Sequence, residues 1–160
     1  MKDTIKQLLN NIRFNERERE GNLVQLGLII EKNTIKYRNN NGFVNLLKPE
    51  YFEVKLDENE INEILDLLIK FINESDSCIC TVIWIFGKSC NKVFLETLFQ
   101  IVLDKYSDNT YAMRQLMFSI DTLDKELIKK NLKTILDVKT KTTDERLKEI
   151  INDMVFRSEM

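Results

Sequence analysis

Residues 75–86 read SDSCICTVIWIF and residues 107–118 read SDNTYAMRQLMF, so one pattern recurs at an offset of 32 residues. One extra residue at the following turn makes the offset 33, and five positions then align pairwise: Leu95, Phe99, Val102, Leu103 and Asp104 with Ile128, Leu132, Ile135, Leu136 and Asp137. A period of about 30–35 residues with two helical halves is typical of stacked helical repeats, in which no unit buries its apolar face alone. The pattern predicts an all-α fold, a short α-solenoid of helical hairpins.

Each copy of the pattern is expected to hold two helices, followed by one helix that covers the open end of the stack. The expected elements are repeat 75–106 with helices 77–88 and 92–106, repeat 107–138 with helices 109–123 and 124–138, and a capping helix at 144–154. The first of these helices is apolar nearly all round, so we expect it to be sandwiched between neighbours, with Trp84 in the core. The whole chain, 1–160, is predicted to be a single repeat domain.

The helix expected at 57–72 has the clearest local signals. Asp57 at the N-cap and Glu60 three residues later resemble a capping box. The predicted buried stripe consists of Ile61, Ile64, Leu65, Leu68, Ile69 and Ile72. The opposite, solvated stripe consists of Asn59, Glu63, Asp66 and Lys70.

Two further helices are expected before this one, at 3–12 and at about 16–32, and an irregular insertion covers 33–55. Within the insertion, Asn41-Gly42 between apolar runs is a hairpin signal, because both residues tolerate positive φ. The alternative for 34–47 is a loop followed by a short helix, and the sequence leaves both open.

Composition narrows the classes of function. The chain has 24 Lys and Arg against 26 Asp and Glu, a net charge of −2, which gives no general attraction to nucleic acid or anionic membranes. No apolar run approaches the roughly 18 residues that span a bilayer, and the amino terminus does not resemble a signal peptide, so we expect a cytoplasmic protein. Mixed Cys/His zinc sites and histidine general bases are excluded because the chain has no histidine. No cofactor, metal or enzymatic activity is expected.

The three cysteines are predicted to be structural. Cys78 and Cys80 are two residues apart on a predicted helix, which does not favour a shared metal or a disulfide, and Cys90 follows that helix. We expect all three to be buried, reduced thiols.

Residues 80–88, CTVIWIFGK, resemble the end of the first helix of a HEAT repeat, and residues 112–118, AMRQLMF, look like the arginine-bearing version of the same element. Phe86 and Ser119 depart from the usual residues of that motif. The resemblance, which covers 57–138, implies an α-helical solenoid that binds proteins on a concave face. Small HEAT-like proteins of this length include bacterial immunity proteins that block a cognate toxin, and the resemblance therefore implies that class of function.

One constellation of polar residues could form a binding surface. If Leu65, Leu95 and Ile128 are equivalent core positions, one row of neighbours is Asp66, Glu96 and Lys129, and the next is Lys70, Gln100 and Lys133. If the helices stack in register, these residues share a surface that is acidic at one end and basic at the other. The candidate partner-binding residues are Glu63, Asp66, Lys70, Glu96, Gln100, Lys129 and Lys133. The alternative is that these residues are only the solvated surfaces of separate helices.

Acidic residues also cluster along the chain between Glu50 and Asp76, where nine carboxylates face only two lysines, a net charge of −7. Such a field can steer a basic partner, although helix capping and solubility also account for it. The leading hypothesis is a non-enzymatic module that binds and blocks a toxin with a basic surface. The alternatives are a scaffold or adaptor domain of a larger assembly and, more remotely, a HEAT-like nucleic-acid enzyme.

Overall fold

The computed structural model describes residues 1–34, 46–121 and 124–160 of the chain, and every regular element in these ranges is helical. They contain no strand, which confirms the all-α fold class. The elements are α1 (Asp3–Phe14), η1 (Glu16–Glu18), α2 (Arg19–Thr34), η2 (Pro49–Tyr51), α3 (Glu58–Glu74), α4 (Ile79–Ser89), α5 (Lys92–Tyr106), α6 (Thr110–Asp121), α7 (Lys125–Lys130), α8 (Leu132–Lys141) and α9 (Glu145–Glu159). The possible hairpin at 34–47 falls almost wholly on residues 35–45, which lie outside the described ranges.

The chain divides into two compact units, Met1–Ser89 (unit 1) and Cys90–Met160 (unit 2). The boundary falls between α4 and α5, so the predicted repeat 75–106 has its first helix in unit 1 and its second in unit 2. The single repeat domain over 1–160 stays a prediction.

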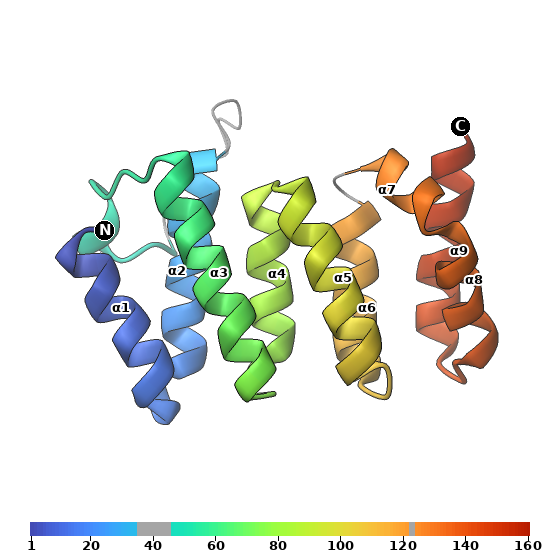
Figure 1. Cartoon of the computed structure of the whole chain (residues 1–160), viewed down its shortest axis with the longest axis horizontal. Helices are drawn as coiled ribbons and strands as arrows, with labels where there is room; N and C mark the ends of the chain where they lie inside the picture. Colours follow the sequence, from blue (N-terminus) through green and yellow to red (C-terminus); the bar gives the residue numbers. More distant parts are fainter. Residues whose placement is uncertain (35–45, 122–123) are drawn as a thin grey trace. The chain divides into compact units, whose positions relative to one another are not determined.

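Unit 1 consists of two helix pairs. Figure 1 shows α1 and α3 in the nearer layer of this unit, with α2 and α4 behind them. The most extensive packing joins α2 to α4, and α1 and α3 pack on those helices. The capping box that starts α3 is confirmed: the Asp57 carboxylate accepts the backbone N–H of Glu60 at 2.8 Å, and the Glu60 carboxylate accepts that of Asp57 at 3.0 Å.

The close approach of α2 and α4 depends on Gly27. A Cβ placed at Gly27 would lie 3.0 Å or less from three atoms of the Trp84 indole, which is closer than carbon atoms can pack. Lys88 covers the same ring, with its ammonium 5.6 Å from the ring centroid. Trp84 is half-buried, so the prediction of a core tryptophan is wrong in degree: its ring packs on α2 but keeps an exposed part.

Two side-chain amides of α2 hold the described part of the irregular segment. Gln25 donates to the carbonyl of Leu46 at 3.0 Å and accepts from the N–H of Lys48 at 2.8 Å. In the last turn of α2, Asn33 donates to the carbonyl of Val54 at 3.2 Å and accepts from the N–H of Leu56 at 2.8 Å. Backbone groups that lack helical partners are thereby satisfied, as buried polar groups require.

Arg19 joins three parts of unit 1 through a buried guanidinium. It donates to the carbonyls of Ile12 and Arg13, at 2.6 and 3.1 Å, in the last turn of α1. It also donates to the hydroxyl of Ser77 at 2.9 Å, and its Cζ lies 5.4 Å from the centroid of the Phe71 ring. These contacts tie the start of α2 to the ends of α1 and α3, and they satisfy helix carbonyls that have no partner within α1.

Cys78 departs from the sequence prediction in position, and all three cysteines depart from it in burial. Cys78 lies before α4 and Cys90 after it, and both adopt left-handed backbone conformations, with φ of 58° and 52°. Cys78 and Cys80 are half-buried and Cys90 is exposed, so the prediction of three buried thiols is wrong. Left-handed backbone conformations of this kind are more usual for glycine than for a residue with a side chain.

In unit 2, the predicted helix 92–106 is confirmed as α5, but the predicted single helix over 124–138 is wrong. Asn131 interrupts it with a ψ of 12°, and its side-chain amide donates to the carbonyl of Leu127 at 2.9 Å. A short polar side chain that bonds a nearby carbonyl competes with the helical ladder. The outcome is two short helices, α7 and α8. Leu136, which the sequence aligns with the half-buried Leu103, is 39% exposed.

The burial patterns of α4 and α6 match at an offset of 34 residues rather than the 32 read from the sequence. Val82, Ile83 and Phe86 are buried in α4, and the corresponding buried residues of α6 are Leu116, Met117 and Ile120. The apolar face of α9 (Leu147, Ile150, Ile151 and Met154) is buried within unit 2, where α9 packs on α6, α7 and α8.

A glycine pair tests the packing of α2. Gly27→Ala should lower the free energy of unfolding by about 1–3 kcal/mol, the usual cost of overpacking, because the added methyl meets the Trp84 ring. Gly21→Ala is the matched control: nothing lies within 4 Å of its Cβ position, so it should stabilise α2 by up to about 1 kcal/mol. Urea denaturation of both variants measures the difference, and stabilisation by both would contradict the close approach.

The geometry of Arg19 can be tested by a substitution that keeps the charge. Arg19→Lys should destabilise the protein by about 2–4 kcal/mol, because an ammonium cannot reproduce the fork that reaches two carbonyls and a hydroxyl. Arg17→Lys, at an exposed position two residues earlier, should change the stability by less than about 0.5 kcal/mol. Equal denaturation midpoints for the two variants would show that Arg19 contributes only its charge.

Candidate functional site

The seven predicted partner-binding residues are divided between the two units. Glu63, Asp66 and Lys70 lie on α3 of unit 1. The others lie in unit 2, Glu96 and Gln100 on α5, Lys129 on α7 and Lys133 on α8. The predicted residues therefore form two separate candidate surfaces, one on each unit.

Within unit 2, the predicted row differs from the observed contacts. Glu96 pairs with Lys130 rather than with Lys129. Lys129 pairs instead with Glu126 of its own helix, with 3.1 Å between nitrogen and oxygen. Gln100 and Lys133 are exposed, and the break at Asn131 places Lys133 on a different helix from Lys129.

Charged residues of unit 2 form several ion pairs between helices. Lys92 of α5 meets Asp124, the N-cap of α7, at 3.0 Å. Arg114 of α6 binds Asp144, the N-cap of α9, through two hydrogen bonds of 2.7 and 2.5 Å. Arg157 of α9 pairs with Asp121 of α6. These carboxylates are neutralised inside the unit and are less available to a partner.

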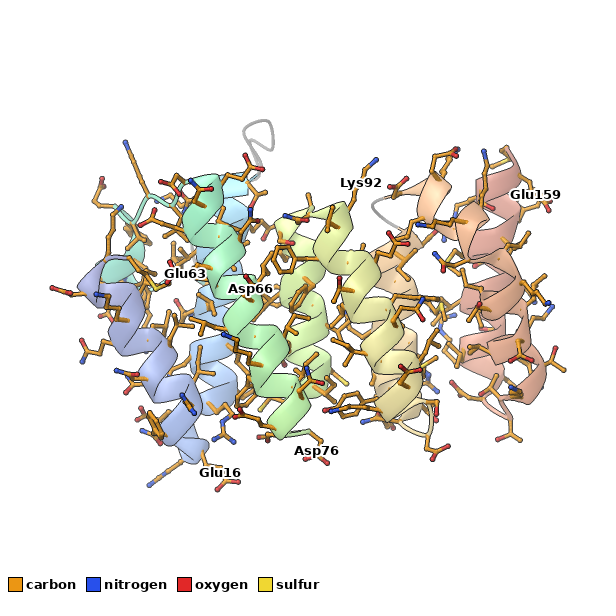
Figure 2. All side chains as sticks on the ribbon, in the orientation of Figure 1. Glu16, Glu63, Asp66, Asp76, Lys92 and Glu159 are labelled. Atoms are coloured by element: carbon orange, nitrogen blue, oxygen red, sulfur yellow. The ribbon has the colours of Figure 1, made fainter. Side chains whose placement is uncertain are left out.

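The carboxylates of α3 in unit 1 are arranged differently. Glu63, Asp66 and Glu74 are exposed and form no hydrogen bond or ion pair with any residue in the described ranges. Figure 2 shows Glu63 and Asp66 on α3, and Asp76 just beyond the end of that helix. Glu74 lies in the last turn of α3, where the helix dipole disfavours an anion. A row of carboxylates thus follows the exposed side of α3, and Lys70 of the same side forms no ion pair with them.

A groove between α1 and α3, which we call the α1–α3 groove, opens beside these carboxylates. Its volume is about 210 Å³. Its apolar lining is Leu9, Ile12, Leu67, Leu68 and Phe71, and its polar lining is Asn10, Arg13, Lys70 and Glu74. Leu67 is 39% exposed, so the groove presents apolar surface to solvent next to charged groups.

Of the seven predicted partner-binding residues, Lys70 alone lines the α1–α3 groove. The sequence did not predict the other lining residues as part of a site. The available signal was a second apolar pair on the helix, Leu67 and Phe71, which are four residues apart and outside the predicted buried stripe. Nothing in the sequence, however, places Leu9 of α1 opposite them. That proximity depends on the packing of α1 on α2 and of α3 on α4 within unit 1.

Other chemistry has little support in the described ranges. They contain no group of three or more Cys, Asp or Glu side chains that could hold a metal ion. Burial raises the pKa of the Cys78 thiol, and a hydrogen bond with Glu20 raises it further. Burial and the charge of Glu20 also raise the pKa of Cys80. Both thiols are therefore poor nucleophiles at neutral pH.

Fold and site together define an all-helical protein with an apolar groove beside unpaired carboxylates. Comparison with protein-family models, with curated proteins and with solved structures found no match to this chain. None of the described helices combines the length and the apolar character needed to cross a bilayer.

The ion pairs of unit 2 predict its response to acid. Hydrogen bonds from Arg114 lower the pKa of Asp144. Burial alone would raise the pKa of Asp124, but bonds from Lys92 and from backbone N–H groups outweigh it and lower that pKa. A carboxylate with a lowered folded pKa stabilises the fold above its unfolded pKa, and this stability is lost as the pH falls through the folded value. Unit 2 should therefore lose stability below about pH 4.

Arg114→Gln should lower the stability at neutral pH and make the denaturation midpoint less dependent on pH between 7 and 3. Arg146→Gln is the control, because Arg146 forms only an exposed pair with Glu149 in its own helix. Circular dichroism at a series of pH values measures both profiles. An unchanged pH profile for Arg114→Gln would show that the Arg114–Asp144 pair does not account for the acid response.

Proposed function

We propose that the chain is a non-enzymatic protein-binding module, and that it binds and blocks a cognate toxin with a basic surface, as an immunity protein does. The observation that carries this proposal is the row of unpaired carboxylates on α3 beside an open apolar groove. Charged groups that steer a partner and an apolar site that holds it are the two components of a protein interface.

The energetics of α3 favour a role in binding over a role in stability. Glu63 and Asp66 are like charges three residues apart, which costs an isolated helix a few tenths of a kcal/mol, and Lys70, four residues from both Asp66 and Glu74, offsets part of this cost. Glu74 costs about a further 0.3–1 kcal/mol at the negative end of the helix dipole. Natural sequences tend to depart from local rules of this kind at functional sites.

The chemistry of the partner follows from the charge. The nine carboxylates between Glu50 and Asp76 attract a positively charged surface and raise the rate of its association. A nuclease or another nucleic-acid-binding toxin has such a surface, and an acidic protein bound over it would exclude its substrate. Inhibition by occlusion needs no catalytic group.

We further propose that the helical hairpins belong to one short HEAT-like solenoid. The support is that the same packing occurs within each unit: the second helices of successive hairpins, α2 and α4 in unit 1 and α6 and α9 in unit 2, pack on each other. The resemblance of residues 80–88 to the HEAT motif agrees with this arrangement.

Charge reversal on α3 tests the proposed function. With a basic partner recovered by pull-down, Glu63→Lys with Asp66→Lys should slow association about tenfold at low salt and change dissociation much less. Raising the salt to physiological strength should remove most of the difference, because exposed charges are screened beyond about 8 Å at 0.15 M. The measurement is the association rate against ionic strength.

The matched control is Glu126→Lys with Asp137→Lys in unit 2, which changes the net charge by the same amount. These carboxylates already pair with lysines of their own helices, so the control should leave the association rate nearly unchanged. Equal slowing by both double variants would mean that only net charge matters. Parallel salt dependences for wild type and the α3 variant would reject the steering role.

A further inference from the structure

We infer that the α1–α3 groove receives one large apolar side chain from an amphipathic helix of the partner, a helix with basic residues one turn before and one turn after that side chain. This inference rests on the proposed function, because it takes the partner to be a basic protein. It adds a specific anchoring site and the pattern of the segment that fills it.

The size of the groove favours a single anchoring side chain. Its volume of about 210 Å³ is below the roughly 300–1,000 Å³ of pockets that hold drug-sized ligands or cofactors. Protein interfaces, in contrast, commonly place one aromatic or aliphatic residue in a well-packed pocket, and that residue carries much of the binding energy. Leu67 and Phe71 of α3 and Leu9 of α1 provide apolar walls for such a residue.

The charges beside the groove indicate what surrounds the anchor. Glu63 and Asp66 lie one turn of α3 before the lining residues Leu67 and Lys70, and Glu74 lies at the other end of the lining. Glu63 and Glu74 are therefore about 16 Å apart along the helix axis, at 1.5 Å per residue. A partner helix that runs along α3 would place a cation near each end if basic residues lay one turn on either side of its anchor.

Lys70 of α3 and Arg13 of α1 restrict this pattern further, because both contribute to the lining and Lys70 lies between Asp66 and Glu74 on α3. Their charges would repel a lysine or arginine next to the anchor but not one a full turn away. The order of charge along α3 is thus negative at Glu63 and Asp66, positive at Lys70 and negative at Glu74. Such a pattern selects against uniformly basic helices as well as for the complementary one.

Three fluorescein-labelled helical peptides test the inference on the full-length chain by fluorescence anisotropy. One has a central Phe with Lys four residues before and after it, the second replaces this Phe with Ser, and the third replaces both Lys with Glu. We expect the first peptide to bind at least tenfold more tightly than the other two. Equal binding of the Phe and Ser peptides, or no binding by any of the three, would overturn the anchoring site.

Two variants and one control connect the binding to the groove. Leu67→Asp and the groove-filling Asn10→Trp should each weaken binding of the Phe peptide at least tenfold. Leu136→Asp is the matched control, since Leu136 of unit 2 is as exposed as Leu67, at 39%, and it should leave binding unchanged. Equal losses for Leu67→Asp and Leu136→Asp would overturn the inference, and thermal melts identify a variant that fails to fold.

The outcomes also separate the inference from the proposed function. If Glu63→Lys with Asp66→Lys weakens peptide binding while Leu67→Asp and Asn10→Trp do not, the steering charges act without the groove and only the anchoring site is wrong. If the Phe peptide depends on Leu67 but binds equally with Lys or Glu flanks, the groove binds apolar side chains and the basic partner is wrong.

Discussion

The buried guanidinium of Arg19 is the contact on which the arrangement of unit 1 depends. A charge removed from water needs partners, and here no carboxylate supplies them; two carbonyls of the last turn of α1, a hydroxyl and an aromatic ring do so instead. The carbonyls are suitable because they form the negative end of a helix dipole. One side chain thus fixes the ends of α1 and α3 relative to each other, and these ends flank the α1–α3 groove.

The two units differ in how their carboxylates are paired, and this contrast favours α3 as a binding surface. Unit 2 pairs acidic residues across helices, and two of them, Asp124 and Asp144, are N-caps, so these carboxylates contribute to folding. In unit 1, the exposed carboxylates of α3 form no ion pair within the described ranges. One of them, Glu74, lies in the last turn, where the helix dipole disfavours an anion. Stability alone does not explain this distribution, which agrees with the proposed attraction of a positively charged partner.

Local signals in the sequence were enough to predict the helical class, the capping box of Asp57 and the bounds of α5. Errors arose where one local side-chain bond, or the packing register between helices, decided the outcome. Asn131 divides a predicted helix by bonding a carbonyl of the preceding turn, and Phe118, aligned with the buried Phe86, is 42% exposed because the true register differs by two residues. Of the candidate site, the charges on α3 were predictable from their spacing. The groove was not, since it depends on two helices that are far apart in the sequence.

The contact between Gly27 and Trp84 also has a spectroscopic consequence. Trp84 is the only tryptophan of the chain, so its emission reports on unit 1 and is silent about unit 2. Its indole packs on the backbone of α2 beneath a lysine, and separation of α2 from α4 would expose the ring to water. Fluorescence and far-ultraviolet circular dichroism, recorded on one sample, therefore distinguish loosening of the first unit from unfolding of the whole chain without any label.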